Sequence, residues 1–258
     1  MKSRKFFLLL LPLAAIPVGF SGAGYVRAQQ QQRGNAELIR AAKTRDFRTA
    51  QQLLIKKEAD PDARDSEGRS ALSWAASKGD VTQTIVLLSL DADPNARDNY
   101  GGTPLMAATF SGDAGTLEYL LLAKADINAC TEYGATALHQ AALSGHVSSV
   151  RVLLSHGADL EARTRGEETP LIKAAQAGKP AVVKYLLARG ADPDAKNKNG
   201  QTALDVAMKY RRDRVVEILQ EANTAKVRLD SGVLSGNENE NSNDINSIAA
   251  HRSAGDSR

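Results

Sequence analysis

Three of the four histidines of the chain lie within residues 137–159: His139, His146 and His156. Imidazoles are common zinc ligands and general bases, so such a group raises the question of a metal or catalytic site. Two histidines that bind zinc from one helix stand four residues apart, whereas these are spaced by 7 and 10 residues. His251 stands alone near the C-terminus. We interpret the histidines as structural and expect no metal, no cofactor and no catalytic residue among them.

Other signatures of enzymes are missing as well. The chain has no Gly-x-Ser-x-Gly, no P-loop, no dinucleotide-binding glycine pattern and no pair of Cys-x-x-Cys motifs. Its one cysteine, Cys130, excludes an intramolecular disulfide. The thiol is either partly exposed and oxidisable or an inert small residue. The sequence therefore predicts a protein that is not an enzyme.

The charge of the chain gives no indication of a nucleic-acid partner. The formal net charge is +3, but residues 1–28 hold four basic residues and no acidic one. Without that segment the balance is 29 basic to 30 acidic residues. A nucleic-acid-binding surface normally needs a clear excess of Lys and Arg, so we exclude this class of partner.

The first 28 residues predict an export signal. The basic start MKSRK precedes the apolar run FFLLLLPLAAIPVGF, and small residues then fit cleavage after Ala28 or, as a second possibility, after Ala23. The alternative is an uncleaved membrane anchor. However, the run of 15 residues is shorter than the roughly 20 that span a bilayer, and Pro12 and Pro17 interrupt it. We expect a periplasmic or secreted protein that keeps no membrane segment after cleavage.

A period of 33 residues organises most of the remaining chain. The pattern Ser/Thr, then Ala or Pro, then Leu begins at residues 70, 103, 136, 169 and 202. Glycines follow in the same register at positions 79, 112, 145 and 178, and paired leucines precede a recurring Ala-Asp segment. A hydroxyl can cap the start of a helix, and glycine can end a helix in the left-handed conformation. Each unit is therefore predicted to hold two short helices joined by a turn, with a hairpin to the next unit.

The motifs TPLxxAxxxG and LLxxGADxNA in a 33-residue unit resemble the ankyrin repeat, and the resemblance covers residues 36–222. It implies an all-α solenoid of about six helix-turn-helix units with short β-hairpin loops. In such proteins the histidine of the TALH pattern, here His139, hydrogen-bonds near the turn between repeats. The predicted units lie near residues 36–64, 65–97, 98–130, 131–163, 164–196 and 197–222, and the outer two are atypical, as polar caps should be.

Some positions depart from the repeat. Thr84 stands where other units carry Leu or Val, while Ile85 stands where they carry charge, so this helix is expected to pack less well or to be rotated. Gly166 comes one position early in RTRGEE, so we expect a different turn there. Residues 29–35 are predicted to form a flexible leader. The polar, Asn- and Ser-rich residues 223–258 are predicted to be a disordered tail.

Ankyrin-repeat proteins bind partners with their hairpin tips and the exposed face of the first helices, so the resemblance implies a protein partner. In the two middle units these positions carry Tyr100, Phe110, Tyr133 and Leu143, a concentration of large apolar groups in a chain with 5% aromatic residues. Such groups within a polar rim are typical of a binding hot spot. The alternative is that they pack against the neighbouring repeat. The polar candidates around them are Glu67, Arg69, Lys78, Glu132 and Arg165.

The sequence thus predicts a monomeric, non-enzymatic module that is exported and binds another protein through the concave groove of its repeats. The chain resembles periplasmic ankyrin-repeat proteins of Gram-negative bacteria. That resemblance implies a scaffolding or protective role, for example toward an exported catalase or toxin. The main alternative is a secreted effector that binds host proteins. No residue identifies the partner.

Overall fold

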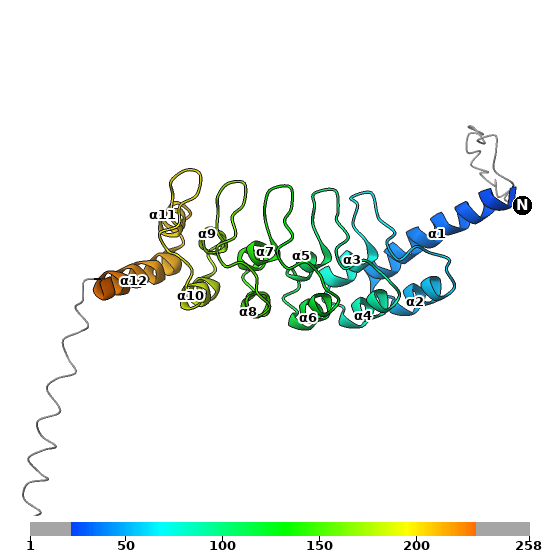
Figure 1. The fold of residues 1–258 in the computed structure, drawn as a ribbon, viewed down its shortest axis with the longest axis horizontal. Coiled ribbons are helices and arrows are strands. Elements are labelled where there is room, and N and C mark those ends of the chain that lie inside the picture. The colour runs from blue at the N-terminus through cyan, green and yellow to red at the C-terminus, as the bar shows by residue number, and fades with distance from the viewer. Residues whose placement is uncertain (1–21, 231–258) are drawn as a thin grey trace, which may run out of the picture.

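The computed structural model describes residues 22–230, and it describes side chains within residues 24–224. This part of the chain holds twelve helices and no named strand. The helices form pairs that stack along one axis (Figure 1). Their bounds are α1 Gly22–Thr44, α2 Phe47–Ile55, α3 Ala71–Ser77, α4 Val81–Ser89, α5 Pro104–Ala108, α6 Ala114–Leu122, α7 Ala137–Ser144, α8 Val147–Ser155, α9 Pro170–Ala177, α10 Pro180–Ala188, α11 Ala203–Lys209 and α12 Asp213–Asp230.

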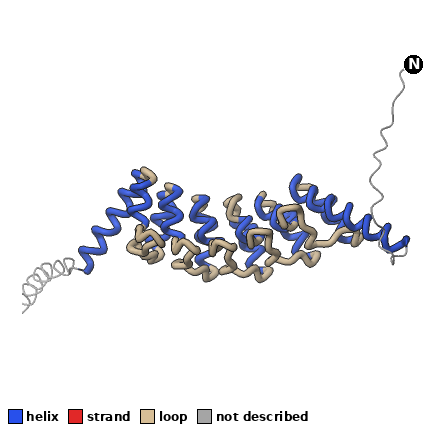
Figure 2. The backbone as a smooth tube through the Cα atoms, turned by 90° about the horizontal axis from the view of Figure 1, so that it is seen from above, coloured by secondary structure: helices blue, strands red, loops and turns tan. Residues whose placement is uncertain are grey.

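Two layers run along the stack. The first helices α3, α5, α7, α9 and α11 pack on one another in order, and the second helices α2, α4, α6, α8, α10 and α12 form the other layer. The loops between the pairs project in a row from the layer of first helices, as Figure 1 shows. The view from above shows the same side-by-side stacking (Figure 2). The prediction of an all-α repeat solenoid is confirmed.

The recurring residues cap the starts of the helices and terminate them, as their chemistry predicts. The hydroxyls of Ser70, Thr103 and Thr169 each accept a hydrogen bond from the backbone N–H three residues later. A left-handed glycine, with φ between 63° and 89°, follows the first helix in each of the four central units, and it is the C-cap residue of α7 and α9. In the outer units Arg45 and Arg211 take this left-handed position instead, with φ of 61° and 54°.

The core is a continuous stack of leucine and alanine. The leucines that begin the first helices of units two to five and those at the centre of the second helices are fully or almost fully buried. Ala75, Ala108, Ala141 and Ala174 are also fully buried, and their small side chains let neighbouring first helices approach. Each unit buries its apolar face against its neighbours, so stability is shared along the array.

The loops between units are hairpins without regular strands. Asp65 N–H donates to the Arg69 carbonyl at 3.0 Å, and the equivalent bonds close the next four hairpins. The only β-bridges in the described chain are the isolated pairs Arg64–Ser70 and Cys130–Thr136. The fifth-unit turn was expected to differ, but it has the same hydrogen bonds, because Glu167 takes the left-handed position with φ of 57°.

Both ends of the solenoid are more helical than expected. Residues 29–35, predicted to be a flexible leader, lie inside α1. Gly34 is the reason that this helix can dock, because a Cβ there would stand 1.9 Å from the Glu58 carbonyl oxygen. Residues 223–230, predicted to be disordered, continue α12. The rest of the predicted tail, 231–258, lies outside the described residues, as does most of the predicted export signal.

The helix of unit two is not rotated. Thr84 is fully buried in α4 and Ile85 is exposed, so the helix keeps the register of its neighbours and buries a hydroxyl. Across residues 22–230 no helix has both the length and the apolar character that crossing a bilayer requires.

Candidate functional site

The histidines lie apart and have separate structural roles. The Nδ1 of buried His139 accepts the Thr136 N–H at 3.2 Å, so its Nε2–H donates to the Glu168 carbonyl, 2.9 Å away in the next unit. Burial lowers the pKa of His139, which keeps the ring neutral. His146 precedes α8 and fits against Gly112, while Nε2 of His156 lies 3.4 Å from the Glu118 carboxylate. His251 lies outside the described residues.

No cluster of three or more His, Cys, Asp or Glu side chains in the described chain is arranged to hold a metal ion. Cys130 is exposed at the base of a hairpin. In three other units this position carries an arginine that donates to the carbonyl 33 residues later, as Arg97 does to Cys130 and Arg163 does to Lys196. Cys130 cannot make this side-chain hydrogen bond, so the repeating series of bonds is interrupted at unit three.

The predicted hot-spot side chains lie at the surface rather than between repeats. The exposed fraction is 58% for Tyr100, 57% for Phe110, 64% for Tyr133 and 39% for Leu143. Packing against the neighbouring repeat, the alternative interpretation, therefore does not account for these side chains. Their exposure on loops and first helices makes them available to a partner.

Backbone hydrogen bonds hold the hairpin tips in a row. Asn99 N–H donates to the Glu67 carbonyl, Glu132 N–H to the Tyr100 carbonyl, and Arg165 N–H to the Tyr133 carbonyl, at 3.1, 3.0 and 2.8 Å. The spacing of the tip side chains is thereby fixed by the main chain. A partner would meet a preorganised surface and lose less conformational entropy on binding.

A pocket of about 280 Å³ opens among the first helices and hairpins of units two to four. Tyr100, Phe110 and Arg69 line it, so the structure brings together three of the predicted residues. The pocket lining does not include the other predicted residues, which are Tyr133, Leu143, Glu67, Lys78, Glu132 and Arg165. The other lining residues were not among the predicted binding residues, and the largest or charged ones are Trp74, Asp98, Met106 and Gln140.

The Trp74 cluster consists of Lys43, Asp65, Arg69 and Trp74, and two of its members, Arg69 and Trp74, line this pocket from unit two. The indole Nε1–H donates to Asp65 at 2.9 Å, while Arg69 Cζ and Lys43 Nζ lie 3.9 and 4.6 Å from the ring centroid. Burial works to raise the pKa of Asp65, but the hydrogen bonds from Trp74 and the turn backbone outweigh it and the pKa is lowered. The cluster therefore keeps a carboxylate charged within a ring of cations and an aromatic side chain.

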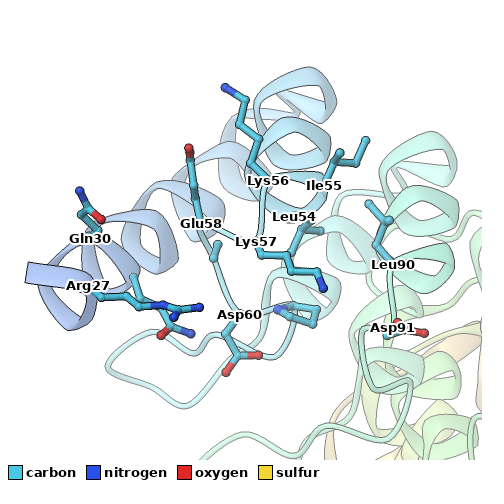
Figure 3. A pocket seen from close by; sticks show the side chains of 13 residues that line it. Arg27, Gln30, Leu54, Ile55, Lys56, Lys57, Glu58, Asp60, Leu90 and Asp91 are labelled. Carbon is cyan, nitrogen blue, oxygen red and sulfur yellow. The ribbon is translucent and has the colours of Figure 1, made fainter. Parts of the chain in front are cut away.

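A larger and more open groove of about 990 Å³ lies at the N-terminal end of the solenoid. Figure 3 shows Arg27 and Gln30 of α1 on one side and Leu90 and Asp91 on the other. Its lining mixes lysines with acidic residues, and Arg27 precedes the cleavage position expected after Ala28. We therefore place the candidate site at the hairpin face and not in this groove.

Comparisons with known proteins identify the repeats. A family model described as ankyrin repeats (3 copies) matches residues 38–131 and 82–164, and a second, described as ankyrin repeats (many copies), matches residues 153–207. No curated protein matches the chain. Together the family matches span residues 38–207, which is more than half of the 258 residues. The chain therefore belongs to the ankyrin-repeat family.

Proposed function

We propose that this protein is an exported, non-enzymatic binding module that holds a partner protein against its hairpin tips and first helices. Ankyrin repeats generally mediate protein–protein interactions, and no enzymatic family is indicated. The observation that carries the proposal is the exposure of Tyr100, Phe110 and Tyr133 on one preorganised face. Aromatic side chains at the centre of an interface supply most of its binding energy.

The surroundings of these rings support the same use of the surface. Glu67, Lys78, Glu132 and Arg165 are all exposed, whereas Arg69 is half-buried and pairs with Glu67 at 2.8 Å. Polar and charged groups around an apolar centre give specificity and favour rapid association. We expect a monomer whose partner covers the central units, and we expect no nucleic-acid ligand.

The test is capture of a partner from the periplasmic and secreted fractions of the source cells. Immobilised protein made from the full chain should retain a partner, and the double variant Tyr100→Ala/Tyr133→Ala should weaken binding about 30-fold, as expected for hot-spot residues. A matched control removes two exposed apolar side chains from the second helices, through Tyr119→Ala/Leu122→Ala. Equal loss in both variants, or no loss in the tip variant, would contradict the proposed surface.

The exported location rests on the basic start and apolar run of residues 1–28. Cleavage after Ala28 would shorten α1 but retain Gly34 and the buried Leu38, which belong to the part that packs on the solenoid. Mass spectrometry of the secreted protein should find Gln29 as its first residue. An intact Met1 would instead support the uncleaved anchor, and recovery of the protein inside host cells would support the effector alternative.

A further inference from the structure

We propose that the pocket between Trp74 and Phe110 binds an arginine side chain of the partner, with Asp98 as its counter-charge. This inference rests on the proposed function, because it specifies the partner's chemistry at the same surface. Equivalent positions in units two and three differ in the residues that surround a carboxylate at the same place in the repeat, Asp65 or Asp98. The pocket exists where unit three lacks two side chains that fill the same place in unit two.

Asp65 and Asp98 are equivalent carboxylates of two successive hairpins. Asp98 lies 33 residues after Asp65, and both use Oδ1 to accept N–H groups of their own hairpin. In unit two the other oxygen, Oδ2 of Asp65, accepts the Trp74 indole and lies 3.4 Å from Lys43 and 3.6 Å from Arg69. An aromatic N–H and two cations therefore surround that oxygen.

In unit three all of these partners are replaced by small residues. The position of Trp74 holds Ala107, and that of Arg69 holds Gly102. Ser77 stands two residues before the left-handed Gly79, as Lys43 stands two residues before the left-handed Arg45. A Cβ on Gly102 would stand 2.6 Å from Oδ2 of Asp98, so this oxygen faces the space that the missing side chain leaves. Within residues 24–224, no side chain donates a hydrogen bond or forms an ion pair with Asp98.

The space left by these residues is the pocket itself, since its lining includes Asp98, Gly102, Ala107 and Ser77. Three aromatic residues, Trp74, Tyr100 and Phe110, are part of its lining. The one cation of the lining, Arg69, is paired with Asp65 and Glu67. No later unit repeats the arrangement. The carboxylate position holds Thr131, Thr164 and Asn197, and in unit five Glu168 and Lys173 form an ion pair in the corresponding places.

Arginine is the side chain that fits these features. The guanidinium is planar, stacks on aromatic rings and donates N–H groups to a carboxylate. It supplies in one group the planar donor that Trp74 provides to Asp65 and the cation that Arg69 provides. Lysine lacks the planar group, and a neutral side chain lacks the charge. Unit two therefore already contains an intramolecular model of the complex, with an Arg69-to-ring distance of 3.9 Å.

A peptide titration tests the ligand directly. The probe is acetyl-Ala-Ala-Arg-Ala-Ala-amide, and the control peptide replaces arginine with citrulline, which has nearly the same shape without the charge. Trp74 is the only tryptophan of the chain, so its indole N–H resonance reports on the pocket without ambiguity. We expect a saturable shift with the arginine peptide and about tenfold weaker binding of the citrulline peptide, because charge-assisted hydrogen bonds are the stronger ones.

Two variants of the full chain complete this test. Asp98→Asn should reduce arginine-peptide affinity about tenfold while leaving the hairpin intact, since Asn197 accepts the same backbone N–H groups in unit six. Ala107→Trp should fill the pocket and abolish the shift. If Ala107→Trp does not fold, Asp98→Asn still decides. Equal binding of the two peptides, or unchanged affinity in Asp98→Asn, would overturn the proposal.

The partner experiment separates this inference from the proposed function. A captured partner should bind about 30-fold more weakly to Tyr100→Ala/Tyr133→Ala, and it should also bind more weakly to Asp98→Asn. If Asp98→Asn has no effect while the tyrosine variant does, the binding face stands and the arginine pocket is wrong. If no partner is captured, the proposed function fails, and the peptide titration alone decides the pocket.

Discussion

Thr84 provides a sharp test of how the second helices pack. Its side chain has an exposed fraction of 0%, and its hydroxyl has no hydrogen-bond partner within the described chain. The equivalent residues Leu117, Val150 and Val183 are apolar and equally buried. An unpaired hydroxyl in such surroundings costs about 1–3 kcal/mol. Because valine has nearly the same shape, Thr84→Val should raise the free energy of unfolding by about 1 kcal/mol.

The assay is urea unfolding at constant temperature, followed by Trp74 fluorescence and by circular dichroism. Both signals are needed because repeat arrays can unfold in parts. An increase of about 1 kcal/mol corresponds to a midpoint roughly 0.5 M higher in urea. Thr116→Val is the matched control, because the equally buried Thr116 hydroxyl donates to Asp113 at 2.7 Å and its loss should lower the midpoint. A lower or unchanged midpoint for Thr84→Val would refute the reasoning and indicate that a water satisfies the hydroxyl.

Three further changes test other features of the repeat. Burial lowers the pKa of His139, so the unfolded chain binds the proton more readily than the folded chain. The free energy of unfolding should therefore fall as the pH drops below about 6.5. The urea midpoint should be lower at pH 5.5 than at pH 7.5, and His139→Gln should reduce this difference. Glu167→Gly should raise the midpoint by relieving a left-handed residue, worth about 0.5–1 kcal/mol, while Gly200→Glu at the equivalent open position should lower it. Cys130→Arg should restore the bond to the Arg163 carbonyl and stabilise the chain by about 0.5 kcal/mol, whereas a destabilised variant would show that this series of bonds contributes nothing.

The fold could be predicted from the sequence because each unit repeats the residue types that start its helices, end them and form their buried face. The hydroxyl caps, the left-handed glycines and the apolar positions recur every 33 residues, and the structure uses them as expected. The ends were harder. The packing of α1 depends on Gly34 meeting the Glu58 carbonyl, a contact between positions with no counterpart elsewhere in the repeat.

Two deviations from the repeat disturb the backbone less than expected, because neighbours constrain each unit. Glu167 has a left-handed conformation, and its hairpin therefore keeps the backbone hydrogen bonds to the adjoining tips. Thr84 is buried, and α4 therefore keeps its register between α2 and α6. In both cases the stacking of repeats outweighs a local preference worth about 1 kcal/mol.

The candidate site could be predicted only in part, because the pocket depends on small residues at positions where another unit carries large side chains. Tyr100 and Phe110 were conspicuous as aromatic residues, whereas Gly102 and Ala107 are unremarkable by type. They become informative only when aligned with Arg69 and Trp74, where their small size beside a retained carboxylate defines the pocket. In a repeat protein, the position most open to a partner is one where the pattern keeps a polar anchor and omits the side chains that would satisfy it. Backbone bonds between hairpins hold that position rigid whatever its side chains are, so recognition can change there while the fold does not.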